Sequence, residues 1–158
     1  MHLAAVDSTS YQIVLVLHLL AVVIGLGAVT LGAVFAAQVR RNPGPGARLL
    51  VETQVRMTKL AGWFVLAIPV FGFGLVGLSD HAYSLSQGWV WQSLVVWVLV
   101  MGVLHGMVLA SGRKLLAALD GAGSAEPAAV AGLVQRLAVG TGLVGLLTIL
   151  GIVRMVFR

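Results

Sequence analysis

The feature that most constrains this chain is a long uncharged stretch near its beginning. From Tyr11 to Val39 there is no Asp, Glu, Lys or Arg. This stretch is longer than the roughly 20 apolar residues that cross a bilayer as a helix. The whole chain is 59% hydrophobic and only 9% charged, whereas soluble domains are roughly 25% charged. We therefore predict an integral membrane protein in contact with the lipid bilayer.

Further apolar runs follow the first, and together they use nearly all of the 158 residues. We predict one all-α domain, residues 1–158, folded as a four-transmembrane-helix bundle with helices at about 11–39, 60–79, 89–112 and 129–153. Pro69 removes a backbone hydrogen bond from the second helix, and a neighbouring helix is expected to help satisfy the freed carbonyl. The segment from Ala47 to Lys59 fits either a short surface helix or an irregular loop.

Basic residues concentrate in the segments that precede the second and fourth helices. They are Arg40, Arg41, Arg48, Arg56, Lys59, Arg113 and Lys114, and Arg136 lies close by. The positive-inside rule places these segments in the cytoplasm and both termini outside, although Arg154 and Arg158 lie at the opposite end. No Lys or Arg precedes the first helix, so we expect it to be retained rather than cleaved as a signal peptide. The localisation that follows is the inner (plasma) membrane, with several passes.

Several function classes are disfavoured by composition and position. The net charge of +5 comes from residues between apolar runs, not from a basic face with interleaved aromatic residues, so we expect no nucleic-acid partner. There is no cysteine, which excludes disulfides and thiolate metal sites. Two G-x-G-x-x-G matches, at 72–77 and 140–145, lie inside apolar spans and do not indicate nucleotide binding. No carboxylate falls within a predicted span, which argues against a proton-coupled transporter.

The predicted spans contain two histidines, His18 and His105, and both are candidate cofactor ligands. Each is either a neutral histidine hydrogen-bonded between helices or a ligand to iron or copper. His18 lies seven residues into its helix and His105 sixteen into a helix that runs the same way. At about 1.5 Å per residue their depths differ by roughly 14 Å, so the two are not expected to bind one haem iron together.

The chain resembles bacterial families of predicted integral membrane proteins of unknown function, related to the HemJ-type protoporphyrinogen oxidases and to the membrane domain of copper-resistance protein D. The resemblance covers most of the chain. Its motifs are Leu17-His18, Trp89-Val90, His105, Gly112-Arg113-Lys114 and Val153-Arg154-Met155-Val156-Phe157-Arg158.

This resemblance implies a haem b protein in which the histidine of the first helix, here His18, is important. It also implies a lysine after the tryptophan that opens the third helix. The stretch from Trp89 to Leu94 has no lysine, so we predict no oxidase activity and assign no catalytic residue. Copper is the alternative cofactor, with His18 as its metal ligand and with Asp80 and His81 as candidate helpers. The alternative function is a non-catalytic accessory or scaffold subunit that associates with other membrane proteins or with itself through glycine-lined faces.

Overall fold

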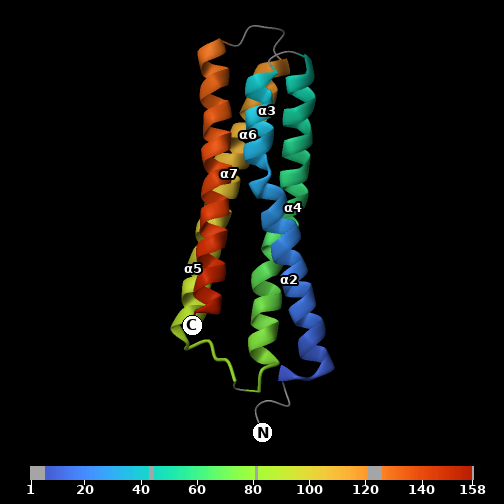
Figure 1. The fold of residues 1–158 in the computed structure, drawn as a ribbon, viewed down its shortest axis with the longest axis vertical. Helices are drawn as coiled ribbons and strands as arrows, with labels where there is room; N and C mark the ends of the chain where they lie inside the picture. The colour runs from blue at the N-terminus through green and yellow to red at the C-terminus, as the bar shows by residue number, and fades with distance from the viewer. Residues whose placement is uncertain (1–5, 43–44, 81, 121–125, 158) are drawn as a thin grey trace.

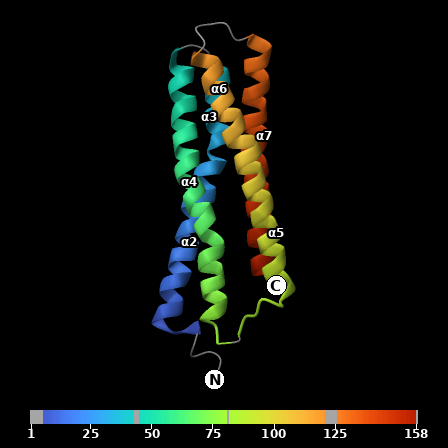
Figure 2. The same cartoon turned by 180° about the vertical axis from the view of Figure 1, so that it is seen from behind.

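The computed structural model describes residues 6–42, 45–80, 82–120 and 126–157, and every regular element in these ranges is helical. The helices form four long rods that lie side by side (Figures 1 and 2). Each rod is long and apolar enough to cross a membrane. The predicted fold class, an all-α four-helix transmembrane bundle, is confirmed.

The elements follow one another in a simple up-and-down order. In chain order they are α2 (Thr9–Thr30), α3 (Gly32–Arg41), α4 (Pro45–Gly77), α5 (Gly88–Val103), the π-helical segment η1 (Leu104–Leu109), α6 (Ala110–Asp120) and α7 (Pro127–Val156). The first rod is α2 with α3, the second is α4, the third is α5 with η1 and α6, and the fourth is α7. The start of α2 and the end of α7 lie at one end of the bundle (Figure 1), which we call the terminal end. The opposite end, which carries Arg40 and Arg41, we call the basic end.

The rods are longer than a bilayer requires. They contain 30 to 33 residues, or about 45–50 Å at the helical rise, whereas the hydrocarbon core is about 30 Å thick. At the terminal end α2 and α5 are apolar around their whole circumference, while α3 and α6 at the basic end are amphipathic. The turns at the basic end therefore extend beyond the hydrocarbon, with charged residues outward and small or apolar residues inward.

This extension corrects the expectation for residues 47–59, which form neither a surface helix nor an irregular loop. They are the first turns of α4, and their buried positions Ala47, Val51 and Val55 recur every four residues along one face. For the same reason the third rod continues to Asp120 rather than ending near 112. Continuous hydrophobicity marks the part of a helix that faces lipid and misses its amphipathic continuation.

The first rod, expected as one helix from 11 to 39, is interrupted at Leu31. The hydroxyl of Thr30 donates a 2.8 Å hydrogen bond to the carbonyl of Gly27, and such bonds to the preceding turn bend helices. Just beyond the break, a Cβ on Gly32 would collide with the side chains of Gln54 and Thr141. The glycine therefore lets α3 approach α4 and α7 closely.

Exposed ion pairs cluster at the basic end, and one of them connects two rods. Glu52 accepts hydrogen bonds from Arg56 at 2.6 Å and from Arg48 at 3.2 Å. Arg48 also pairs with Asp120 at the end of α6. All these groups are at least partly exposed, so each pair contributes little to stability, and only the Arg48–Asp120 pair joins α4 to α6.

Candidate functional site: a histidine in a cavity at the terminal end

His18 is a buried polar residue in the middle of α2, with only 9% of its surface exposed. Its Nδ1 lies 3.0 Å from the backbone carbonyl oxygen of Ile68 in α4. A carbonyl can only accept a hydrogen bond, so Nδ1 is the nitrogen that carries the proton. In a neutral imidazole the other nitrogen, Nε2, then holds a lone pair. No residue in the described ranges hydrogen-bonds to Nε2.

The sequence around His18 explains why it reaches α4. His18, Ala21 and Gly25 are all buried and share one face of α2, as positions i, i+3 and i+7 do. A Cβ on Gly25 would lie 2.9 Å from the backbone nitrogen of Val65. The bare glycine therefore lets the two helices pack in close contact, and the His18 ring meets the α4 backbone two turns away.

Pro69 lies in the same part of α4 as Ile68, and a hydrogen bond from the third rod compensates for its effect on the helix. Its ring nitrogen has no hydrogen, so the carbonyl of Val65, one turn earlier, loses its helical donor. The indole Nε1 of Trp97 in α5 donates a 2.8 Å hydrogen bond to that carbonyl. The expectation that a neighbouring helix satisfies the carbonyl freed by Pro69 is confirmed.

A cavity of about 490 Å³ lies beside His18, between the pair α2 and α4 and the pair α5 and α7. Helix α2 packs mainly on α4, α5 packs mainly on α7, and α4 has little direct contact with α5. The two pairs diverge toward the terminal end (Figures 1 and 2). The volume falls in the range of about 300–1,000 Å³ that is usual for small-molecule and cofactor sites.

Most of the cavity wall is aliphatic, with a few aromatic, polar or sulfur-containing side chains. These are Tyr11, His18, Phe73, Tyr83, Trp89, Ser93, Trp97 and Met155. Two of them, Tyr83 and Trp89, stack edge to face with ring centroids 5.8 Å apart. Such a wall suits a large, mostly apolar ligand that one or two polar atoms hold in place.

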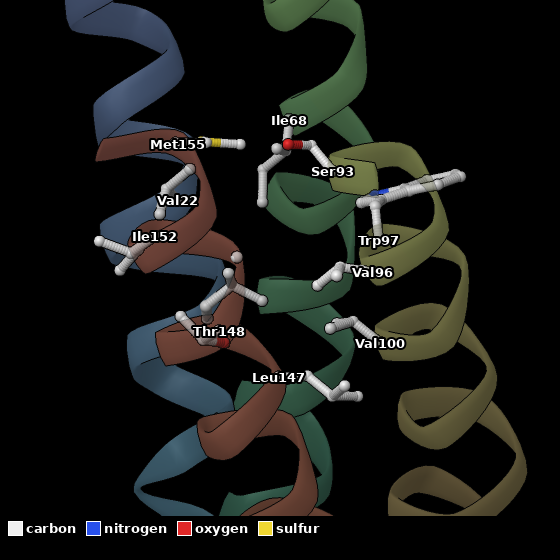
Figure 3. Close-up of a pocket in the computed structure, with 12 residues that line it drawn as sticks. Val22, Ile68, Ser93, Val96, Trp97, Val100, Leu147, Thr148, Ile152 and Met155 are labelled. Atoms are coloured by element: carbon white, nitrogen blue, oxygen red, sulfur yellow. The ribbon is translucent and has the colours of Figure 1, made fainter. Parts of the chain in front are cut away.

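A second, smaller cavity of about 70 Å³ adjoins the first and lies closer to the middle of the bundle. Figure 3 shows residues that line it, with Val96 and Val100 facing Leu147 and Thr148 across the space between α5 and α7. Both cavities share Ile68, Trp97 and Met155 in their walls. The space beside His18 thus continues inward as a narrow apolar pocket.

His105 lies elsewhere. It belongs to η1, its side chain is exposed, and its Nδ1 bonds the carbonyl of Met101 on the same helix at 3.1 Å. It lines neither cavity, and the side chain of Met101 packs against the core. The structure does not bring His105 to His18, and a cofactor role for His105 stays a prediction.

Of the two candidate copper helpers, Asp80 does not line the cavity beside His18. Asp80 follows α4 with a positive φ of 47°, and His81 lies outside the described residues. Within the described ranges, no three His, Cys, Asp or Glu side chains group together as a metal site.

Sequence reasoning found His18 but missed the cavity, Trp97 and Met155. One signal for Trp97 was available, because a proline inside an apolar helix leaves a carbonyl that needs a donor and indole is a donor without acceptor capacity. The cavity depends on the divergence of two helix pairs, which no local pattern encodes. No family model, curated protein or solved structure matches the chain.

Proposed function

We propose that this membrane protein binds haem b and that Nε2 of His18 would be a ligand to its iron. The observation that carries the proposal is the hydrogen bond from Nδ1 of His18 to the Ile68 carbonyl. Metal-binding histidines commonly donate their other ring N–H to a carbonyl or carboxylate, which fixes the tautomer and orients the ring. A buried, oriented imidazole with a lone pair, beside a cavity of cofactor size, is a site suited to iron.

The donor set fits haem b in particular. The porphyrin supplies four nitrogen ligands itself, so the protein need offer only one or two side chains, and a single histidine is a common haem ligand. Apolar and aromatic side chains make up nearly all of the remaining wall, as expected for a site that holds a large planar group. Bound haem would supply one-electron or oxygen chemistry. The HemJ-type resemblance agrees with this choice.

The test is an optical spectrum of the protein purified after expression with ample haem. Wild-type protein is expected to show a Soret band, and His18→Ala is expected to lose it while still inserting and remaining folded. His105→Ala is the matched control, because it removes the same ring from a membrane helix away from the cavity, and it should keep the band. A colourless wild-type protein would refute the proposal.

Copper is separated from haem by metal analysis of the same samples. Haem b predicts iron that depends on His18 and is accompanied by the Soret band. The site would be assigned to copper instead if one copper ion bound per chain without a Soret band. That copper should also be lost when His18 is replaced.

The alternative function, an accessory subunit of a membrane complex, is supported by an exposed face of the third rod. Gly102 and Gly106 lie one turn apart on the third rod, and a Cβ on either would meet nothing within 4 Å. His105, also exposed, lies between them in sequence, and small residues at this spacing let membrane helices approach each other. Gly106→Leu tests this function by native electrophoresis in mild detergent. Loss of an oligomer or complex, with the Soret band unchanged, would assign association to this face.

A further inference from the structure

The cavity beside His18 has two walls that come from different helix pairs. His18 stands on the wall made by α2 and α4, and Met155 stands on the wall made by α5 and α7. A group bound between these walls can therefore receive one ligand from each side.

Met155 is directed inward by the last turn of α7. The other residues from Ile152 to Phe157 are exposed, and Met155 alone among them is partly buried. In Figure 3 its side chain extends from α7 toward Ile68 and Ser93, on the facing helices. The thioether thus points into the cavity rather than toward lipid.

Met155 also lies near the residue of α4 to which His18 is hydrogen-bonded. Ile68, which Met155 faces in Figure 3, is the residue whose carbonyl holds the His18 ring at 3.0 Å. His18 and Met155 therefore both lie next to the same residue of α4, Ile68. This differs from the pair His18 and His105, which do not share a cavity.

From this arrangement we infer that the sulfur of Met155 would be a second protein ligand to the haem iron, supplied from the wall that faces His18. The inference rests on the proposed function, because it names a ligand for the same haem. A methionine at such a place could simply fill space, since its flexible thioether adapts to irregular gaps. Ligation makes a different prediction, because histidine and methionine together give a six-coordinate iron with a raised reduction potential.

The experiment compares haem-loaded wild-type protein with Met155→Leu, which removes the sulfur and nearly conserves the volume. Wild-type protein should show the optical spectrum of a low-spin, six-coordinate iron. Met155→Leu should keep its haem through His18, but its spectrum should shift to that of a high-spin, five-coordinate iron. Met101→Leu is the control, because Met101 lines neither cavity, and it should keep the wild-type spectrum.

A second variant keeps the test independent of folding losses. Met155→His replaces one iron ligand by another and should restore a low-spin spectrum with a reduction potential below that of wild type. Haem that stays low-spin with an unchanged potential in Met155→Leu would overturn the Met155 assignment and leave the His18 proposal standing. Wild-type protein that takes up no haem would overturn both.

Discussion

The indole nitrogen of Trp97 donates a 2.8 Å hydrogen bond to the backbone carbonyl of Val65, the carbonyl that Pro69 deprives of its helical donor. This bond is one of the few direct links between α4 and α5, which otherwise make little contact. It also lies in the cavity wall, because Pro69 and Trp97 both line the space beside His18. The proline and the tryptophan therefore act as one structural unit.

Replacing Trp97 by Phe should destabilise the bundle, because the Val65 carbonyl then has no donor in a medium without water. The expected cost is about 1 kcal/mol in the free energy of unfolding, within the range for unsatisfied buried groups. Unfolding in mixed detergent micelles measures it. Trp91→Phe is the matched control, because Trp91 is 58% exposed, and it should have little effect.

A double-mutant cycle with Pro69→Ala then identifies the cause. The alanine introduced in Pro69→Ala restores the backbone N–H that the Val65 carbonyl lacks, so Trp97→Phe should cost clearly less in that background. Equal costs in the two backgrounds would show that Trp97 stabilises the bundle by packing alone.

Gly25→Ala should separate α2 from α4 at the His18 site. The added methyl would lie 2.9 Å from the Val65 nitrogen and 3.1 Å from the Phe64 Cβ. Overpacking of this kind costs about 1–3 kcal/mol, and the shifted helix should also weaken haem retention. Gly27→Ala is the control, since a Cβ there meets nothing within 4 Å. Equal stability of the two variants would contradict the close approach described here.

The orientation of the bundle is predicted from its charges. Eight basic residues lie in or close to the two segments assigned to the cytoplasm, against Arg154 and Arg158 on the other side. A reporter fused after Arg48 should be active only in the cytoplasm, and one fused after Ser84 only outside. The opposite pattern would place both termini in the cytoplasm.

We expect that the protein does not replace a protoporphyrinogen oxidase. The stretch in which the HemJ-type resemblance implies a lysine runs here from Trp89 to Leu94 without one. Four residues of this stretch line the cavity, namely Trp89, Val90, Ser93 and Leu94. The check is growth of a bacterial strain that lacks the oxidase. Growth without added haem would show that the lysine is dispensable.

Much of the fold was predictable, because a charge-free run as long as Tyr11 to Val39 has few alternatives to a membrane helix. The helix ends at the basic end were not, since the residues from Ala47 to Lys59 mix polar and apolar types. Their buried face is decided by packing against neighbouring rods. The break at Leu31 likewise depends on a local bond from Thr30 that hydropathy does not register.

The candidate site divides in the same way. His18 was identifiable because an imidazole in hydrocarbon needs a partner, and that reasoning holds without knowledge of its neighbours. The partner itself, the Ile68 carbonyl, is fifty residues away in the chain. Met155 was part of a motif in the sequence, but its place in the cavity wall depends on the last turn of α7, which directs this residue inward.

The most direct test of His18 as a haem ligand replaces its side chain by free imidazole from solution. His18→Gly should lose the Soret band of the haem-loaded protein, and added imidazole should restore it by entering the space that the side chain leaves and binding the iron. His105→Gly should keep the band with or without imidazole. A His18→Gly protein that keeps its full Soret band without imidazole would contradict the assignment of His18 as the haem ligand.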